Sequence, residues 1–337
     1  MKFIKVQSTH AQGLVESNKN RNSPFQRLPQ KYEKFIRKEV WELSENSAGV
    51  SISFFSDTTH LDIKWSVKND NRMNHMTEAA IKGLDLYHQI GEVWHYINTG
   101  LPNGKENKQT FFNKIPKKIR EFRLYLPLYD TVTNIEIGLD SESIFEVIIK
   151  KDPPIVFYGT SITQGACASR PGLAHTNIIS RKLDNDCINL GFSGNGHLES
   201  SIGSIIANID TSLIVIECIP NMETTIKIKD RIIPLILAIR DGSNNQKTPI
   251  IFIEQCIIDT DYINKMDTEN IKAKNNELNR QINMAKSDGI ENIFIIKQDN
   301  CINKNSEATV DTIHFNDLGF DRYASHFVKN IHALNIF

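Results

Sequence analysis

The stretch "IVFYGTSITQGACASRPG", residues 155–172, joins a run of β-forming residues to a loop rich in small residues. The run at 155–159 is apolar almost throughout, which is typical of a strand covered on both faces in a parallel sheet. A loop that follows such a strand can cradle a phosphate, present a nucleophile or simply turn the chain. No Gly-Lys-Ser or Gly-Lys-Thr sequence follows, so a phosphate-binding P-loop is not indicated. The role of Ser161 therefore depends on what other loops contribute.

Four more apolar runs follow this stretch, and patterns typical of helices lie between them. The runs cover residues 187–191, 213–218, 249–254 and 292–297, and the helical patterns cover 224–241, 269–289 and 317–334. Alternation of this kind predicts a parallel sheet with helices on both faces and right-handed crossovers. Ligands of such sheets bind at the carboxyl ends of the strands, so the loops at those ends are where a site is expected.

The first half of the chain has a different pattern, in which short strands follow one another at turns. The predicted strands are 39–43, 50–55, 60–67, 92–98, 120–128, 134–139 and 144–150. Several alternate apolar with polar residues, as half-buried antiparallel strands do. Pro153 and Pro154 mark the change of pattern. We therefore predict a β-sandwich of jelly-roll type over residues 1–150 and an α/β domain over 151–337.

Composition excludes several classes of partner. The 337 residues carry a net charge of −1 and no basic cluster, so neither nucleic acid nor an anionic membrane surface is expected as a partner. No stretch approaches the ~20 apolar residues of a membrane helix. We therefore expect a soluble protein. The N-terminus lacks the apolar segment of a secretory signal, and the protein could be cytoplasmic or exported with a signal absent from this chain; the oligomeric state is also left open. The five cysteines include no CxxC pair, and neither a disulfide framework nor a zinc site is indicated.

Polar groups suited to nucleophilic catalysis occur in four strand-end loops of the second half. They are Ser161, Gly194, Asn221 and the pair Asp311 and His314. A serine hydroxyl needs an adjacent base, and histidine suits that role because its ordinary pKa is about 6.5. A carboxylate can then orient the imidazole, and backbone or amide N–H groups can stabilise an oxyanion.

Simpler roles exist for each of these residues. Asp311 could cap a helix, with His314 at the surface, Asn221 could cap the helix that follows it, and Gly194 could only form a turn. We favour the catalytic interpretation because four loops carry matching groups. The sequence around Ser161 is not GxSxG, since Thr163 occupies the place of the second glycine, so the nucleophile elbow of α/β-hydrolases is excluded.

The segments "GTSITQG", "GFSGNG", "PNM" and "DTIHFNDLG" together resemble the four blocks of the SGNH (GDSL-type) hydrolases. "GLDLY" at 83–87 resembles the GxDLY motif of a bacterial two-domain subgroup, in which a β-sandwich precedes the hydrolase domain. The resemblance implies a flavodoxin-like three-layer α/β/α sandwich after an all-β domain. Two departures are a threonine at 160, where the family name has aspartate, and Pro220 before the asparagine of the third block; both alter loop shape.

Carried over by position, the resemblance makes Ser161 the nucleophile, His314 its base and Asp311 the residue that orients the base. The oxyanion hole would consist of the Ser161 and Gly194 backbone N–H groups and the Asn221 side chain. The implied activity is a serine esterase that needs no metal or organic cofactor. By analogy alone, the substrate is expected to be a small acyl ester, with an acetylated saccharide first.

Two other functions remain open. A lipid or thioester acylhydrolase would use the same catalytic residues and differ only in the acyl pocket. A non-catalytic carbohydrate-binding protein on a hydrolase scaffold is the alternative from another class, although all five catalytic-block residues are retained.

Other polar and aromatic residues are weaker candidates. Asn195, Arg170 and His197 are possible substrate-pocket residues, and Arg170 is more strongly expected to pair with Glu217 or Glu254. His175 is expected to be a packed helix residue. Tyr87, Trp94 and Tyr96 could stack on a sugar, but packing in the core of the sandwich is the favoured explanation.

Overall fold

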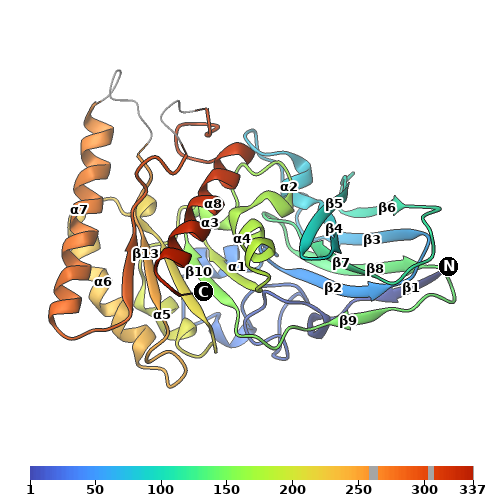
Figure 1. The fold of residues 1–337 in the computed structure, drawn as a ribbon, viewed down its shortest axis with the longest axis horizontal. Helices are drawn as coiled ribbons and strands as arrows, with labels where there is room; N and C mark the ends of the chain where they lie inside the picture. The colour runs from blue at the N-terminus through green and yellow to red at the C-terminus, as the bar shows by residue number, and fades with distance from the viewer. Residues whose placement is uncertain (258–264, 303–306, 337) are drawn as a thin grey trace. The chain divides into compact units, whose positions relative to one another are not determined.

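The computed structural model describes residues 1–257, 265–302 and 307–336 (Figure 1). The chain divides into two compact units, the first made of residues 1–151 and 167–189 and the second of 152–166 and 190–337. The boundary that we expect from the sequence at residue 150 stays a prediction.

The first unit contains two antiparallel sheets with one shared apolar core. Their strand orders are β1-β8-β3-β6 and β5-β4-β7-β2-β9. The strands are β1 (Lys2–Lys5), β2 (Ser51–Ser56), β3 (Leu61–Val67), β4 (Leu84–Ile90), β5 (Val93–Gly100), β6 (Glu106–Phe112), β7 (Arg120–Tyr125), β8 (Val132–Leu139) and β9 (Glu146–Ile148). Alternate side chains of both sheets, such as Phe54, Ile63 and Leu124, enter one buried cluster. The predicted β-sandwich is therefore confirmed.

One predicted strand is wrong. Residues 39–43, "EVWEL", lie in the helix α1 (Lys38–Ser44). Its buried residues are Val40, Trp41 and Ser44, a spacing of one and four that places them on one face of a helix. A half-buried strand would instead bury every second residue. The β-forming composition of this segment favoured a strand, although its adjacent apolar residues Val40 and Trp41 do not alternate with polar ones.

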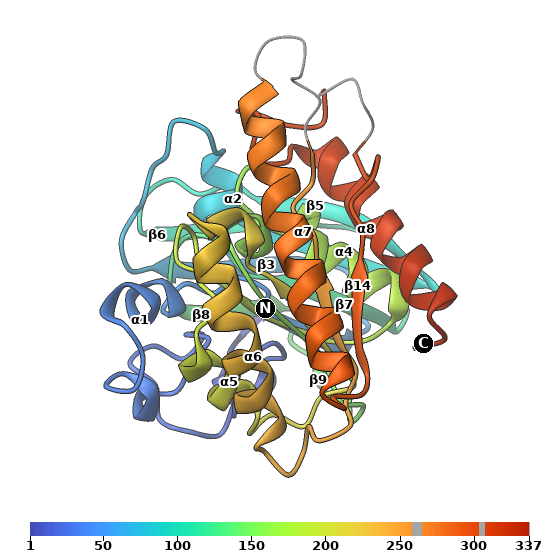
Figure 2. The same cartoon turned by 90° about the vertical axis from the view of Figure 1, so that its left-hand side faces the viewer.

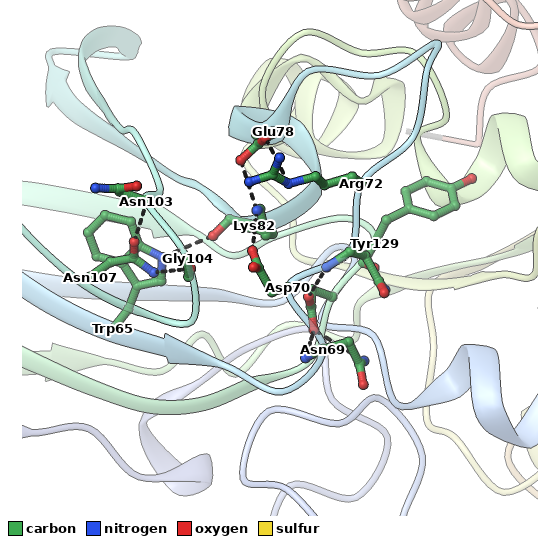
Figure 3. Close-up of polar contacts among 12 residues, drawn as sticks. Trp65, Asn69, Asp70, Arg72, Glu78, Lys82, Asn103, Gly104, Asn107 and Tyr129 are labelled. Atoms are coloured by element: carbon green, nitrogen blue, oxygen red, sulfur yellow. Dashed lines mark hydrogen bonds and ion pairs between the residues drawn. The ribbon is translucent and has the colours of Figure 1, made fainter.

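A buried ammonium holds together one end of the first unit (Figure 3). Lys82, the last residue of α2 (Glu78–Lys82), is 0% exposed, and its Nζ donates to Glu78 at 2.8 Å and to Asp70. Its backbone carbonyl accepts a hydrogen bond from the Trp65 indole at 2.9 Å. Burial lowers the pKa of Lys82, but the two carboxylates outweigh burial and raise it above its ordinary value. The buried charge of Lys82 is therefore paired with two carboxylates, and we interpret the cluster as stabilising the fold.

The three aromatic residues of the sandwich differ in burial. Tyr87 is buried and makes edge-on contacts with Tyr96 and Tyr125, with ring centroids 5.8 and 5.6 Å apart. Tyr96 is 45% exposed, and the half-buried Trp94 lies 4.3 Å from the Arg123 guanidinium. Core packing, expected for all three, therefore describes Tyr87 alone.

The second unit contains most of a five-stranded sheet of order β11-β10-β12-β13-β14; residues 187–189 of β11 are counted with the first unit. The strands are β10 (Ile155–Gly159), β11 (Cys187–Gly191), β12 (Leu213–Glu217), β13 (Ile250–Ile253) and β14 (Ile293–Ile296). The pairs from β10 to β14 are parallel. This is the 2-1-3-4-5 order of flavodoxin-like sheets, whose topological switch point lies between the first and third strands, here β10 and β12. The predicted α/β fold and all five of its strands are confirmed.

Helices cover both faces of this sheet. They are α3 (Ser161–Gln164), α5 (Ser200–Ile206), α6 (Thr225–Arg240), α7 (Lys265–Ser287) and α8 (Asp317–Ala333); α4 (His175–Leu183) belongs to the first unit. Phe157 of β10 packs on Phe327 of α8, with ring centroids 5.6 Å apart. The next residue, Tyr158, points to the other face and accepts a hydrogen bond from the Glu199 N–H, just before α5. Figure 2 shows α5, α6 and α7 side by side on that second face.

Candidate active site

Ser161 begins the single-turn helix α3, directly after β10. The Thr160 side chain accepts from the Ile162 N–H at 3.3 Å, and the Thr163 hydroxyl accepts from the Thr160 N–H at 3.2 Å. The Thr160 side chain also accepts from the Thr163 N–H, and this bond and the one from the Thr160 N–H to the Thr163 hydroxyl form a capping box, which fixes the backbone on both sides of the serine. The turn 160–165 is therefore held rigidly, with Ser161 at the switch point of the sheet.

Glu217, the last residue of β12, binds this turn through its side chain. It is 5% exposed, and its carboxylate accepts from the Thr163 hydroxyl at 2.7 Å and from the Tyr323 hydroxyl of α8. Burial and the neighbouring carboxylate raise the pKa of Tyr323 well above its ordinary value, so the phenol stays protonated and donates. The threonine that breaks the GxSxG pattern is thus the one that anchors the nucleophile turn to the sheet.

His314 and Asp311 lie beside Ser161. His314 Nε2 is 2.8 Å from Ser161 Oγ, and His314 Nδ1 is 2.7 Å from Asp311 Oδ2. The other carboxylate oxygen, Asp311 Oδ1, accepts from the backbone N–H groups of Ile313 and His314 at 3.1 and 2.8 Å. Burial favours the neutral acid, but these hydrogen bonds and the imidazole outweigh it and hold the pKa of Asp311 below its ordinary value. Asp311 is therefore an ionised acceptor that faces an imidazole N–H.

The turn that joins this pair is strained at Thr312. Its φ of +66° lies in the left-handed region, which a β-branched residue rarely adopts. This conformation turns the backbone so that the Asp311 side chain contacts both the backbone N–H and the ring of His314. Strain of this kind persists where the surrounding contacts outweigh it, and it concentrates at functional sites.

The loop after β11 approaches the third-block asparagine. Asn221 lies half-buried after β12, and its amide oxygen accepts from the N–H groups of Asn195 and Gly196, both at 3.1 Å, in the orientation that satisfies the amide. The amide NH2 is then the part of Asn221 that can donate to another group. Gly194 is exposed, and its φ of +67° lies in the left-handed region. An added Cβ would meet no neighbouring atom, so glycine is favoured here by the backbone conformation and not by close packing. The structure thus brings the backbone of Asn195 to the Asn221 side chain, and a pocket role for Asn195 stays a prediction.

The predicted ion pair of Arg170 exists, but its partner differs from the predicted ones. Arg170 Nη1 lies 2.7 Å from both Asp85 Oδ2 and the Tyr87 hydroxyl, all within the first unit. Asp85 also accepts from the Gly172 N–H at 2.7 Å and the Thr99 hydroxyl at 2.6 Å. Asp85 and Tyr87 belong to the "GLDLY" segment, so this motif binds the segment 170–172. A contact of Arg170 with substrate stays a prediction.

The other candidates have simpler surroundings. The carboxylate of Glu254 accepts from the Asn279 amide and the Gln298 N–H, at 2.6 and 3.4 Å. His175 is fully buried in α4, which confirms the packed histidine. The His197 carbonyl accepts from Arg231 at 2.8 Å, and a pocket role for its side chain stays a prediction.

A cavity of about 500 Å³ opens beside the serine and histidine in the second unit. Thr160 and Ile162, on either side of Ser161, form part of its wall, as do Ile313 and Phe315, on either side of His314. The wall also includes Ile271 and Lys274 of α7. Sequence reasoning missed this wall because α7 presents only an amphipathic pattern, which carries no signal of a cavity.

Within the described residues, no group of three or more His, Cys, Asp or Glu side chains is arranged to hold a metal ion. Among the same residues, no helix is both long and apolar enough to cross a membrane.

Comparisons with known proteins identify the family of both parts of the chain. Residues 152–332 match the model of the GDSL-like lipase/acylhydrolase family, and residues 1–145 match that of the N-terminal domain of SGNH-hydrolase-type esterases. No curated protein matches the chain.

Several solved structures are similar over the whole chain. A protein described as a GDSL-like lipase from Bacteroides ovatus is 32% identical, with a TM-score of 0.91 over 99% of this chain and 98% of that one. A salicylyl-acyltransferase from a tetracycline biosynthetic pathway shares the fold at 16% identity, with a TM-score of 0.79 over 100% and 98%. An acetyl xylan esterase from Butyrivibrio proteoclasticus does so at 12% identity, with a TM-score of 0.63 over 100% of both chains. The chain belongs to the GDSL-like lipase/acylhydrolase family and is an esterase or acylhydrolase of the SGNH type.

Proposed function

We propose that this protein is a serine esterase in which Ser161 attacks the ester carbonyl and His314 accepts the serine proton. The observation that carries the proposal is the continuous contact from Ser161 Oγ to His314 Nε2, 2.8 Å, and from His314 Nδ1 to Asp311, 2.7 Å. An ionised Asp311 can only accept, so the proton of the neutral imidazole lies on Nδ1. Nε2 is then free of a proton and able to take the one on Ser161.

The reaction would proceed through an acyl-enzyme. His314 transfers the proton from Ser161 to the leaving alcohol, and then activates a water molecule that hydrolyses the acyl-serine. The backbone N–H groups of Ser161 and Gly194 and the Asn221 amide would stabilise the oxyanion of each tetrahedral intermediate. Such a donor typically contributes about 2.7–4 kcal/mol to transition-state stabilisation. The contacts of the Asn221 oxygen with Asn195 and Gly196 support this role because they orient the NH2 group.

For the substrate, we propose an acetyl ester on a saccharide. The fold shared with an acetyl xylan esterase supports this choice, and it does so by analogy of fold alone.

A larger acyl group is the second candidate, and the cavity favours it. About 500 Å³ exceeds what an acetyl group fills, and Ile162, Ile253 and Phe315 make much of its wall apolar. A lipid or thioester acyl chain, or an aromatic acyl group, could occupy this space while the ester carbonyl lies at Ser161.

The test is hydrolysis of p-nitrophenyl esters by the purified chain and by Ser161→Ala. We expect the wild type to release p-nitrophenol from the acetate and Ser161→Ala to lose at least about 10³-fold in kcat/KM. The matched control is Ser8→Ala, which removes a serine hydroxyl from the first unit, at a position remote in sequence from every catalytic block, and should leave kcat/KM unchanged. Equal rates for wild type and Ser161→Ala would contradict the assignment of Ser161 as the nucleophile.

The acyl-chain series then separates the two substrate classes. A fall in kcat/KM from acetyl to octanoyl favours the acetyl ester, and a rise favours the larger acyl group in the cavity. A screen of acetylated oligosaccharides, with acetate release as the readout, identifies the alcohol.

A further inference from the structure

Two cysteine side chains meet near the cavity. Cys256 Sγ and Cys301 Sγ are 3.0 Å apart, about 1 Å longer than a disulfide bond. Both are present as free thiols. At this distance the two sulfurs are in direct contact, with no other atom between them.

The fold explains why residues 45 positions apart come together. Cys256 follows β13 and Cys301 follows β14, and these neighbouring parallel strands are paired up to Ile253 and Ile296. The two loops therefore leave the same edge of the sheet side by side. Because the pair depends on strand order and not on a short spacing such as CxxC, the sequence carried no sign of it.

The two thiols differ in accessibility, and they differ from the other cysteines. Cys256 is half-buried and forms part of the cavity wall, whereas Cys301 is 5% exposed. Cys167, Cys187 and Cys218 are buried. A small reagent would thus reach Cys256 first, with Cys301 already in contact behind it.

We propose that Cys256 and Cys301 are a disulfide-forming site, oxidised by a low-molecular-weight disulfide such as oxidised glutathione. This inference does not rest on the proposed function, because it concerns only the state of the two thiols.

The chemistry is an ordinary pair of thiol–disulfide exchanges. The Cys256 thiolate attacks one sulfur of oxidised glutathione, which forms a mixed disulfide and releases one glutathione thiolate. The Cys301 thiolate then attacks Cys256 Sγ, which forms the intramolecular bond and releases the second glutathione. The two protons of the cysteine thiols pass to the two glutathione thiolates. Two electrons leave the cysteine pair and reduce the one glutathione disulfide.

The bond would act on the wall of the cavity and on the nucleophile turn. Cys256 and Tyr323 both line this cavity, and Tyr323 donates to Glu217, which accepts from Thr163 of the nucleophile turn. Joining the loops after β13 and β14 would fix the part of the wall that Cys256 forms. Closing a loop of 45 residues also restricts the unfolded chain.

The test uses the purified, reduced full chain in glutathione buffers of increasing oxidised fraction. After an acid quench and alkylation with N-ethylmaleimide, peptide mass spectrometry should find a linked Cys256–Cys301 peptide that dithiothreitol separates. The oxidised protein should melt roughly 4–10 °C higher than the reduced one. Cys301→Ser should stop at a stable Cys256–glutathione adduct, while Cys187→Ser, which removes another buried cysteine, should still form the linked peptide.

Two results would overturn the proposal. One is full alkylation of both Cys256 and Cys301 after incubation of the wild type in oxidised glutathione alone. The other is a linked peptide that joins different cysteines. The wild-type measurement decides the matter even where a serine variant does not fold.

Discussion

Asp85 in the first unit and Asp311 in the second are both aspartates that accept three hydrogen bonds or more, but their surroundings are opposite. Asp85 is 0% exposed, and its oxygens are occupied by Arg170, the Gly172 N–H and the Thr99 hydroxyl. The side chain of Asp311 is 40% exposed and contacts mainly its own turn and the ring of His314.

The difference separates stability from catalysis. A buried carboxylate with a fixed cation must keep its partners, because an unpaired charge left inside costs several kcal/mol. An exposed carboxylate contributes little to folding, since water can replace its partners. Asp311 can therefore be specialised for orienting one imidazole, in a turn where Thr312 has a strained backbone. Asp85 instead fixes the segment 170–172 against strand β4, which contains most of the "GLDLY" segment.

The largest effect is expected from Asp311→Asn. The amide can donate to His314 Nδ1, which would place the imidazole proton on Nε2 and leave no acceptor for the Ser161 proton. We expect kcat to fall about 10³- to 10⁴-fold, the order found for the corresponding change in the serine protease triad, with KM for p-nitrophenyl acetate and the unfolding midpoint nearly unchanged. Steady-state kinetics and urea unfolding of the same preparation check both. A large loss of stability with full activity would contradict the distinction between the two aspartates.

Asp85→Ala tests the other side of the comparison. It leaves the Arg170 guanidinium without its carboxylate and the Gly172 N–H and Thr99 hydroxyl without an acceptor. We expect the free energy of unfolding of the first unit to fall by about 3–5 kcal/mol, measured by urea denaturation. The matched control is Glu42→Ala, which removes an exposed carboxylate 3.7 Å from Lys38 and should cost no more than about 0.5 kcal/mol. Equal effects of the two variants would show that burial of Asp85 does not decide its contribution.

Sequence reasoning reached the second unit more completely than the first, for a physical reason. A strand that is covered on both faces must be apolar along its whole length, so the five strands from β10 to β14 stand out as uninterrupted runs. In the first unit, the composition of "EVWEL" is typical of a strand, but the spacing of its buried residues is that of a helix. The prediction of a strand relied on the composition and was wrong. Contacts between distant residues, such as Arg170 with Asp85 or Cys256 with Cys301, depend on strand order and leave no periodic trace.

Thr312→Gly tests whether the turn beside Asp311 is strained. Glycine adopts a φ of +66° without the steric cost that a β-branched residue has there, so we expect the free energy of unfolding to rise by about 1 kcal/mol. Thr133→Gly, at an exposed position of β8, is the control and should lower it by about 0.5–1 kcal/mol. A loss of stability in Thr312→Gly would mean that the threonine side chain contributes more than its backbone costs. The turn also holds Asp311 against His314. If glycine loosens this pair, kcat should fall while KM changes little, which steady-state kinetics would show.

The smallest effect is the pH dependence that Asp311 contributes to stability. Its pKa in the folded protein is below the ordinary value of about 3.9, so the folded state binds this proton less readily than the unfolded state. Its contribution is therefore fully present above about pH 4 and is lost as the pH falls through the folded pKa. Because the carboxylate is largely exposed, we expect wild type to exceed Asp311→Asn by less than about 1 kcal/mol at pH 6. Urea unfolding of both proteins from pH 6 downward should show this difference shrinking toward zero at the acid end. A difference that grows with acidity would mean that the unfolded state, and not the native turn, holds the lower pKa.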